Sequence, residues 1–404
     1  MKRAAQIITV DRSEYLSIDS LSEFGSKNQA TEVELYNIEK ARILSGNTIQ
    51  ERFKHFFHFE IKEELSLGEG YSPLIKSRGA IAKLLHHNSI YLKNETTNPT
   101  WSFKDKGSWA MSHHTLALGE KLMATVSTGN MGNSTAAYAS RAGFESLVIV
   151  PNYASMDKIK AASIAGANIL SVNTNNFSNM KKWLADWAPK NNLRLSSGNN
   201  PIRVEGYKLT AFNLFEQFNG NLPDYIAIPT SACGHIRGVF KGFVELKKAG
   251  YIETLPKMII VQASGNAPLV NALEKGMNKP DIVDKPNTIA SAITTGNPLG
   301  GEEIIEKAFK HNWLFEKVSE EEILEGQKLL AQEGIFVEPS AATLPYAIKK
   351  LIDADKIHKN ESVVMVLTGG GLKDHNNIKI DFSSIIKAND DVLEKTLLKL
   401  TNYK

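Results

Sequence analysis

The feature that most constrains the fold is an alternation of short apolar runs with helix-length segments. The runs are rich in valine, isoleucine and leucine over their whole length, which is typical of strands buried on both faces of a parallel sheet. Helix-length segments such as 133–143 and 156–166 separate most of them, and the second ends on Gly166, a common helix end. The alternation predicts an α/β fold with mainly parallel, open sheets flanked by helices. The runs lie at 89–95, 121–126, 146–151, 167–172, 224–229, 257–263 and 362–368.

The length and the two ends of the chain suggest a division into domains. A chain of 404 residues is too long for one compact core and suggests two domains. Residues 1–65 are polar, and we expect them to be partly helical. The segment 276–298 contains three prolines and is interpreted as a loop.

Charge and composition exclude several classes of protein. Lysine and arginine number 47 against 44 aspartates and glutamates, a net charge of +3, which argues against a nucleic-acid-binding protein. No apolar run reaches the roughly 18 residues that a membrane span needs, and the N-terminal apolar stretch is too short for a signal peptide. Cys233 is the single cysteine, so no intramolecular disulfide can form. We therefore expect a soluble cytoplasmic protein that binds a small molecule.

Four of the predicted strands lead into small, polar or glycine-rich turns. In open α/β sheets ligands bind at the carboxyl ends of the strands, so these turns together suggest a built site. Each turn alone has a plainer interpretation as a helix cap, a tight turn or a flexible strand exit. The four turns are "TTNPTWSFKDKG" (96–107), "STGNMGNS" (127–134), "TSACGHIRG" (230–238) and "TGGGLKD" (368–374).

The side chains in and near these turns favour one cofactor chemistry. Lys104 alone is most simply a surface lysine and Arg203 a surface ion-pair partner. The histidine pairs at 86–87 and 113–114 are interpreted as surface residues, and no histidine spacing supports a metal site. A lysine that forms a Schiff base, beside a helix N-terminus that holds a phosphate, instead fits pyridoxal phosphate.

Six motifs together resemble the threonine synthases, pyridoxal-phosphate enzymes of fold type II that are similar to the tryptophan synthase β chain. The resemblance runs from about residue 66 to about residue 375. Its motifs are "NPTWSFKDKG", "STGNMGNSTAAYASRAG", "SGNNPIRVEGYK", "PTSACGHIRGVFKGFVEL", "EGIFVEPSAATLP" and "VLTGGGLKD".

The resemblance implies roles for individual residues. Lys104 is similar to the lysine that carries the cofactor, Asn130 to the asparagine at the ring hydroxyl, and Thr368 to the hydroxyl residue facing the ring nitrogen. The implied cofactor-binding residues are Lys104, Phe103, Asn130, Ser231, Ala232, Cys233, Gly234, His235 and Thr368. The implied substrate-binding residues are Ser127, Thr128, Met131, Asn200, Arg203 and Lys208.

The resemblance also implies a reaction and an architecture. The reaction is elimination of the γ-phosphate of O-phospho-L-homoserine and hydration at Cβ, which gives L-threonine. Lys104 would act as the base, with its pKa pushed toward neutrality by an apolar wall of Phe103 and Trp101. A small domain (110–200) would close over the substrate, inserted in a large domain (1–109 and 201–404) with residues 1–65 as an extension. A homodimer is implied.

Four positions depart from the family pattern and leave the substrate open. The family commonly has glycine at Trp101, threonine at Met131, glutamine at Tyr207 and a Gly-Asn-rich run at 231–235. Threonine synthase is therefore one of three hypotheses. The second is a paralogue acting on another substituted amino acid, such as a phosphoserine-using synthase like cysteate synthase, or a threonine or serine dehydratase. The third is a non-catalytic, ligand-binding relative, against which the intact Lys104 argues.

Overall fold

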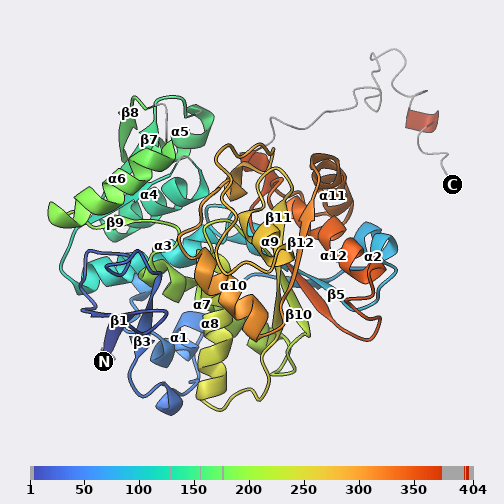
Figure 1. Cartoon of the computed structure of the whole chain (residues 1–404), viewed down its shortest axis with the longest axis horizontal. Helices are drawn as coiled ribbons and strands as arrows, with labels where there is room; N and C mark the ends of the chain where they lie inside the picture. Colours follow the sequence, from blue (N-terminus) through green and yellow to red (C-terminus); the bar gives the residue numbers. More distant parts are fainter. Residues whose placement is uncertain are drawn as a thin grey trace. The chain divides into compact units, whose positions relative to one another are not determined.

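The larger of two main sheets is mostly parallel, as the apolar runs predict (Figure 1). Its strand order is β12-β11-β10-β13-β5-β4, and only β4 runs antiparallel to its neighbour. The central strands β10 and β13 are buried along their whole length, which explains their continuously apolar sequences. The strands are β4 (Leu74–Lys76), β5 (Ile90–Asn94), β10 (Tyr225–Pro229), β11 (Lys257–Ala263), β12 (Leu314–Val318) and β13 (Val363–Leu367).

This computed structural model describes residues 4–127, 129–154, 156–174, 177–374, 395 and 397–399. The chain divides after Asp374 into two units, and all that follows concerns the first, Met1–Asp374. The C-terminal part of the predicted large domain, from residue 375 onward, lies almost entirely outside the described residues.

A second, four-stranded sheet is parallel throughout, in the order β8-β7-β6-β9. It has its own small apolar clusters around Val148 and Ile149. The sheet lies within the range 110–200, for which a small domain is predicted; the domain boundaries themselves stay a prediction. Its elements are β6 (Leu122–Val126), β7 (Glu145–Pro151), β8 (Asn168–Val172), β9 (Leu195–Ser196), α4 (Asn130–Ala142), α5 (Met156–Ile164) and α6 (Phe177–Lys190).

The first 35 residues contain strands, so the expectation of a partly helical extension is wrong there. They form an antiparallel sheet in the order β2-β1-β3. In β3 the side chains alternate between buried and partly buried, a period-2 pattern short enough to be overlooked in a polar context. Short helices follow, as expected. The elements are β1 (Ala5–Thr9), β2 (Tyr15–Leu16), β3 (Thr31–Leu35), η1 (Ile38–Lys40), α1 (Ile49–Arg52), η2 (Lys54–Phe56) and η3 (Glu63–Leu65).

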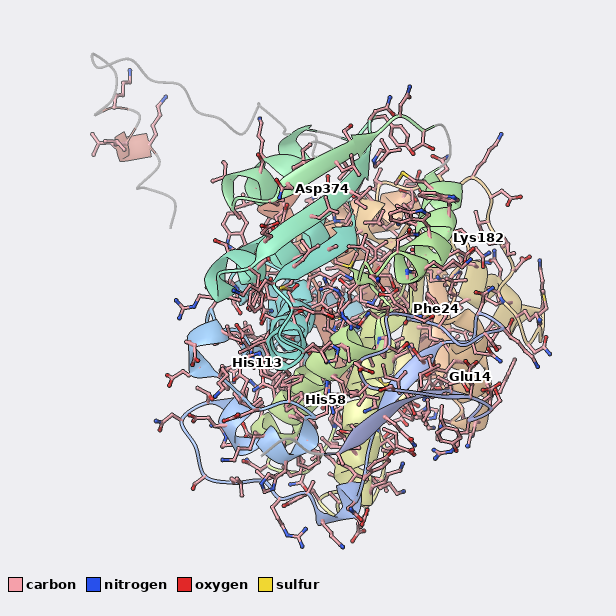
Figure 2. All side chains as sticks on the ribbon, turned by 90° about the vertical axis from the view of Figure 1, so that its left-hand side faces the viewer. Glu14, Phe24, His58, His113, Lys182 and Asp374 are labelled. Atoms are coloured by element: carbon pink, nitrogen blue, oxygen red, sulfur yellow. The ribbon has the colours of Figure 1, made fainter. Side chains whose placement is uncertain are left out.

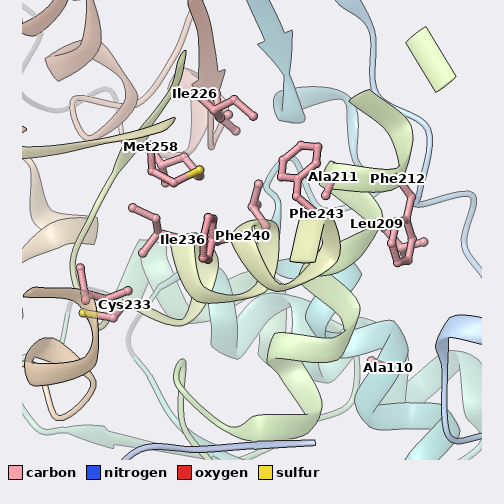
Figure 3. Packing of buried hydrophobic residues seen from close by; sticks show 14 of the residues in the cluster. Ala110, Leu209, Ala211, Phe212, Ile226, Cys233, Ile236, Phe240, Phe243 and Met258 are labelled. Carbon is pink, nitrogen blue, oxygen red and sulfur yellow. The ribbon is translucent and has the colours of Figure 1, made fainter. Parts of the chain in front are cut away.

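Helices α3 and α7 carry the chain between the two main sheets, and α8, which joins β10 to β11, packs against α7. Helix α8 buries an apolar stripe at Ile236, Phe240 and Phe243, spaced at one face of a helix, toward Ile226 of β10 and Met258 of β11 (Figure 3). The long helices are α3 (Lys104–Ala117), α7 (Pro201–Gln217) and α8 (Gly234–Lys248). The remaining helices are α2 (Ala80–Leu85), α9 (Pro268–Glu274), α10 (Gly301–Lys310), α11 (Glu320–Gln332), α12 (Leu344–Asp353), η4 (Glu95–Thr97), η5 (Ser291–Ile293), η6 (Ala341–Thr343) and η7 (Gly371–Lys373).

The extension packs on the C-terminal half of α3 through histidines, so the prediction that His113 and His114 lie on the surface is wrong. Both are 1% exposed. His58 Nε2 lies 3.1 Å from His114 Nδ1 (Figure 2 labels His58 and His113). The Lys62 amide donates to His113 Nε2 at 3.0 Å, and burial lowers the pKa of His113 to about 4, so the ring is neutral.

All seven apolar runs contain the strands they predict, and the overlooked strands share a physical feature. β4 and β12 lie at the two edges of the large sheet and have no fully apolar run because one side faces solvent. β9 has two residues. Pairing with neighbouring strands, rather than an apolar run in their own sequence, determines where such strands form.

Helices α3 and α7 cross closely at Gly206. A Cβ atom on Gly206 would lie 2.0 Å from the backbone oxygen of Lys106. We predict that Gly206→Ala lowers the free energy of unfolding by about 3 kcal/mol, since backbone atoms cannot move aside as a side chain can. Urea unfolding measures this. Gly129→Ala is the matched control, because space around that position is open, and it should cost about 1 kcal/mol or less. Equal losses in the two variants would contradict the prediction.

Candidate active site

Lys104 begins helix α3 at the carboxyl ends of the central strands. The turn before it is fixed by β-type contacts with the residues that follow β13. The Phe103 amide donates to the Thr368 oxygen at 3.0 Å, and the Gly370 amide donates to the Trp101 oxygen at 2.9 Å. The structure thus brings Lys104, Phe103 and Thr368 together, at the sheet edge where an α/β fold binds ligands.

The Lys104 amine lies against aromatic rings. Its Nζ is 4.3 Å from the centre of the Phe103 ring and 5.9 Å from that of Tyr207. Burial lowers the pKa of Lys104 from 10.5 to about 7, the charge of Arg203 lowers it further, and Glu338 opposes the shift. About half of these amines are therefore neutral near pH 7 and able to attack a carbonyl carbon.

Lys106, two residues further along the same helix, has a different environment. Its ammonium donates to Glu95 at 2.6 Å and to Thr210 at 3.0 Å, and both charged side chains are completely buried. Residues i and i+2 of a helix do not share a face. The motif "SFKDKG" therefore holds one structural lysine, Lys106, and one amine placed for chemistry, Lys104.

The turn 231–235 leads into the N-terminus of α8. Cys233 adopts a left-handed conformation with φ of 74°, and no side chain caps the helix. The Ser231 hydroxyl accepts from the Thr295 amide at 3.2 Å, which leaves its own hydrogen to donate. The first amides of an α-helix have no partner within the helix and favour an anion. The turn, with Ala232 and Gly234, therefore has the donors that a phosphate needs.

Two contacts place this turn beside Lys104. The His235 ring stacks on Phe103, with centroids 3.8 Å apart and planes 13° from parallel. A Cβ atom on Gly234 would lie 2.0 Å from the Gly198 oxygen, and a Cβ atom on Gly198 would lie 3.9 Å from Lys104 Nζ. The predicted carrier lysine and the predicted phosphate turn therefore border one site.

His235 carries no charge in this site. It is 6% exposed, and among the described residues neither ring nitrogen has a hydrogen-bond partner. Burial lowers its pKa to about 3. A neutral ring adds no positive charge beside Lys104, so its side chain contributes packing and leaves the phosphate to the backbone amides.

Asn130 contacts Glu338, a residue for which the sequence predicted no role. The amide nitrogen of Asn130 donates to both carboxylate oxygens of Glu338, at 2.6 and 3.0 Å. Glu338 is 4% exposed, and its own amide donates to the Gly369 oxygen at 3.0 Å. The sequence could have indicated Glu338, because it belongs to the family motif "EGIFVEPSAATLP". Asn130, Glu338 and Thr368 thus form one wall of the site.

The predicted substrate residues fall into two groups, and the first borders the Lys104 amine. A Cβ atom on Gly198 would lie 3.8 Å from Met131 Sδ, so the Met131 thioether and the Lys104 amine flank the same glycine. The Ser127 hydroxyl accepts from the Gly129 amide at 3.3 Å in the turn before α4. Thr128 lies outside the described residues.

Arg203 is a buried cation without a carboxylate hydrogen-bonded to it among the described residues. Its guanidinium donates to three hydroxyls, and Nε has no acceptor in this part of the chain. It is 0% exposed, so its interpretation as a surface ion-pair partner is wrong. A buried cation with no carboxylate in direct contact is costly and is suited to an anionic ligand. The three hydroxyls belong to Ser108, Thr135 and Ser196.

The second group consists of residues whose polar atoms are used for structure. Asn200 Oδ1 caps α7 by accepting from the Ile202 amide at 2.9 Å. The Lys208 ammonium donates to the Phe56 oxygen, to Glu205 at 2.7 Å and to Glu245 at 2.8 Å. These three acceptors use all of its hydrogens. We therefore leave Lys208 out of the proposed substrate ligands.

Trp101 does not form the apolar wall expected of it. Its side chain is 52% exposed, so Phe103 and Tyr207 provide the wall instead. Trp101 has φ of 61°, in the left-handed region that favours glycine. The common family glycine at this position therefore reflects backbone conformation, and the tryptophan costs about 1 kcal/mol.

The residues present fit pyridoxal phosphate. The site offers an amine whose pKa is lowered to about 7, amides at the start of α8 that no side chain caps, and a glycine, Gly234, at a backbone contact where a Cβ would clash. Thr368 lies beside this site, because its oxygen accepts from the amide of Phe103, next to Lys104. Among the described residues no cluster of potential metal ligands is found.

The comparison with a family model agrees with this site. The model described as "Pyridoxal-phosphate dependent enzyme" matches residues 65–369. The threonine synthase of Methanocaldococcus jannaschii is 36% identical over 327 residues, which cover 80% of this chain and 80% of that relative. The threonine synthase of Halalkalibacterium halodurans is 35% identical over 332 residues, covering 81% and 90%.

Solved structures share the fold at lower identity. A fungal L-serine ammonia-lyase from Rhizomucor miehei has a TM-score of 0.61 at 21% identity and covers 74% of this chain and 93% of its own. Threonine deaminase isoform 2 from Solanum lycopersicum has a TM-score of 0.60 at 22% identity, covering 77% and 85%. These likenesses confirm fold type II. The family match and the relatives identify the chain as a pyridoxal-phosphate-dependent lyase that belongs to the threonine synthase family.

Proposed function

We propose that this protein is a threonine synthase, which converts O-phospho-L-homoserine and water to L-threonine and phosphate. The observation that carries the proposal is the buried Arg203 guanidinium near the Lys104 amine, with no carboxylate hydrogen-bonded to it in the described chain. A substrate with a phosphate at its far end supplies the missing negative charge. Threonine synthases at 36% and 35% identity support this substrate class.

Each step of the proposed reaction has a residue to perform it. Bound pyridoxal phosphate stabilises negative charge at the substrate Cα. Lys104 Nζ removes the Cα proton and moves protons at Cβ, which its pKa near 7 allows. Arg203 holds the phosphate as it leaves Cγ, and Ser127 orients the carboxylate. Phosphate departs with the electron pair of the Cγ–O bond, and Cγ then takes up a proton to become the methyl group. Water adds its hydroxyl at Cβ, its remaining proton is released with the phosphate, and a proton returns to Cα.

Two further properties belong to the proposal. We propose that the protein acts as a homodimer, as the family resemblance implies, and in the cytoplasm, as the single cysteine suggests. No helix in the described part of the chain is long and apolar enough to cross a membrane. The two-domain division, with residues 110–200 closing over the substrate, is also part of the proposal.

One observation favours the second candidate, a dehydratase or a paralogue with another substrate. Met131 stands where the family commonly has threonine, and its thioether borders the Lys104 amine. A lost hydroxyl removes a hydrogen-bond donor from the substrate pocket. A lost hydrogen bond to a charged group costs about 1.5–3 kcal/mol, which is enough to change a substrate preference.

The first test compares substrates. We expect the purified protein with pyridoxal phosphate to release phosphate from O-phosphohomoserine and form threonine in equal amounts. O-Phosphoserine and threonine serve as the matched alternatives, with phosphate and ammonia both assayed. Ammonia from threonine would favour the dehydratase, and phosphate from O-phosphoserine alone would favour the paralogue. Turnover of none of the three would favour a ligand-binding relative.

The second test removes the amine. We predict that Lys104→Ala abolishes the visible absorption of covalently bound pyridoxal phosphate and lowers phosphate release by about four orders of magnitude or more, because one residue supplies both carrier and base. Lys349→Ala is the control, since Lys349 pairs with Asp353 in an exposed i,i+4 bridge on α12. A Lys104→Ala protein that keeps both the band and the turnover would exclude Lys104 from these roles.

The third test measures the pH dependence of cofactor attachment. Only a neutral amine attacks the aldehyde, so a pKa of about 7 predicts that the rate with the apoprotein rises up to about pH 7 and then levels off. Stopped-flow absorbance between pH 5 and pH 9 measures this rate. Nα-acetyl-lysine in solution provides the reference, whose rate continues to rise toward its ordinary pKa. A protein rate that follows the reference throughout contradicts a lowered pKa.

A further inference from the structure

A segment of the N-terminal extension reaches the candidate substrate-anion site. Residues 19–31 lead from the end of β2 into the first residue of β3, and an arginine binds the backbone at each end of this segment. Arg194 donates to the Ser20 oxygen at 2.7 Å and to the Asp19 oxygen at 2.9 Å. Arg237 donates to the Thr31 oxygen at 2.7 Å. Figure 2 labels Phe24 within this segment. The path of residues 19–31 is therefore fixed at both ends.

Glu23 is the residue of this segment that contacts the site. Its Oε1 accepts from the Ser197 amide at 2.6 Å and from Asn200 Nδ2 at 2.7 Å. Its own backbone oxygen accepts from the Thr31 hydroxyl at 2.6 Å. These contacts hold the carboxylate on the loop that contains Gly198, which faces Lys104 Nζ. The same loop leads directly into α7, whose N-terminus favours negative charge.

Glu23 also lies in the electric field of Arg203. Burial raises the pKa of Glu23 above its ordinary value, and the hydrogen bonds from Ser197 and Asn200 together with the Arg203 charge limit this rise. No hydrogen bond joins the two side chains, and Arg203 keeps Nε without an acceptor among the described residues. The Glu23 carboxylate therefore balances part of the Arg203 charge from a distance, without an ion pair between the two side chains.

We propose that Glu23 is a specificity-determining residue: an internal anion that sets, by charge repulsion, how strongly the Arg203 site holds a phosphate or sulfate group. The inference rests on the proposed function only in placing the substrate anion at Arg203. An incoming dianion meets the favourable Arg203 charge and the unfavourable Glu23 charge together. Removing the Glu23 charge while keeping its hydrogen-bond acceptor should therefore tighten anion binding and reduce selectivity among anionic substrates.

The test uses the full-length protein with pyridoxal phosphate bound and sulfate as the probe. Sulfate is titrated by calorimetry at one pH and constant ionic strength, so that screening is the same throughout. Glu23→Gln keeps an oxygen for Ser197 and Asn200 and removes the charge. We expect its sulfate affinity to rise about tenfold over the wild type, and its KM for O-phosphohomoserine to fall with a smaller change in kcat.

Two matched variants separate charge from shape. Glu23→Asp keeps the charge but shortens the side chain, and its sulfate affinity should stay within about twofold of the wild type. Glu34→Gln removes a carboxylate of the same extension, on β3, that pairs with Arg12, and it should also leave the affinity unchanged. Far-ultraviolet circular dichroism and urea unfolding confirm that every variant is folded.

The outcomes are distinct. Equal sulfate affinity in Glu23→Gln and the wild type would overturn the inference, as would equal tightening in Glu23→Gln and Glu23→Asp, because shape rather than charge would then decide. Absence of sulfate binding in all variants would also overturn it. A protein that turns over no O-phosphohomoserine, yet responds to Glu23→Gln with tighter sulfate binding, would reject the proposed substrate and support the role of Glu23.

Discussion

The site depends on a backbone contact between two segments far apart in the sequence. Gly234 at the start of α8 packs against the Gly198 oxygen at a distance that leaves no room for a Cβ. On the other side of Gly198 lies the Lys104 amine, and the His235 ring stacks on Phe103. The Lys104 amine and the first amides of α8 can bind one cofactor molecule only if the contacts that position each of them are fixed together. Close packing of this kind transmits any displacement directly, so these glycines and rings determine the geometry of the site.

The electrostatics of the site follow from the same packing. Burial removes water from Lys104, and the neighbouring Arg203 charge further disfavours a second cation. Arg203 in turn is held by hydroxyls, which fix its position without neutralising it. A buried cation without a directly bonded carboxylate is expensive, and the Arg203 charge lowers the pKa of the lysine that must be neutral to react. Glu23 partly balances the charge of Arg203, and Glu338 opposes the lowering of the Lys104 pKa. The Arg203 guanidinium therefore has two effects: it lowers the pKa of Lys104, and it attracts the anion of the proposed substrate.

The sequence predicted the parts of the fold whose signal is local. Continuous apolar runs identified seven strands, all but β8 of them largely buried, and glycine-rich turns identified the strand ends where the site lies. Edge strands such as β12 were missed because their side chains are half exposed. At the site, the resemblance supplied Lys104 and the turn at 231–235, but sequence alone could not separate Lys208 from Arg203, since both are basic residues on α7. Their difference is tertiary: Lys208 meets two carboxylates, whereas Arg203 meets hydroxyls. Glu23 was invisible for the same reason, because its partners lie more than 170 positions away.

The departures from the family pattern have unequal consequences once they are placed. Trp101 is largely exposed, and its left-handed backbone conformation costs little free energy, so it does not reshape the pocket. Tyr207 packs inside, where its ring contacts Phe103 and leaves no room for a Cβ on Gly107. Because Tyr207 supports the ring beneath the Lys104 amine, a change at that position alters the amine's position as well as the pocket wall. Met131 borders the amine from the opposite segment. Differences in substrate from other members of the family should therefore arise from Met131 and Tyr207 acting on Lys104, and not from the more conspicuous tryptophan.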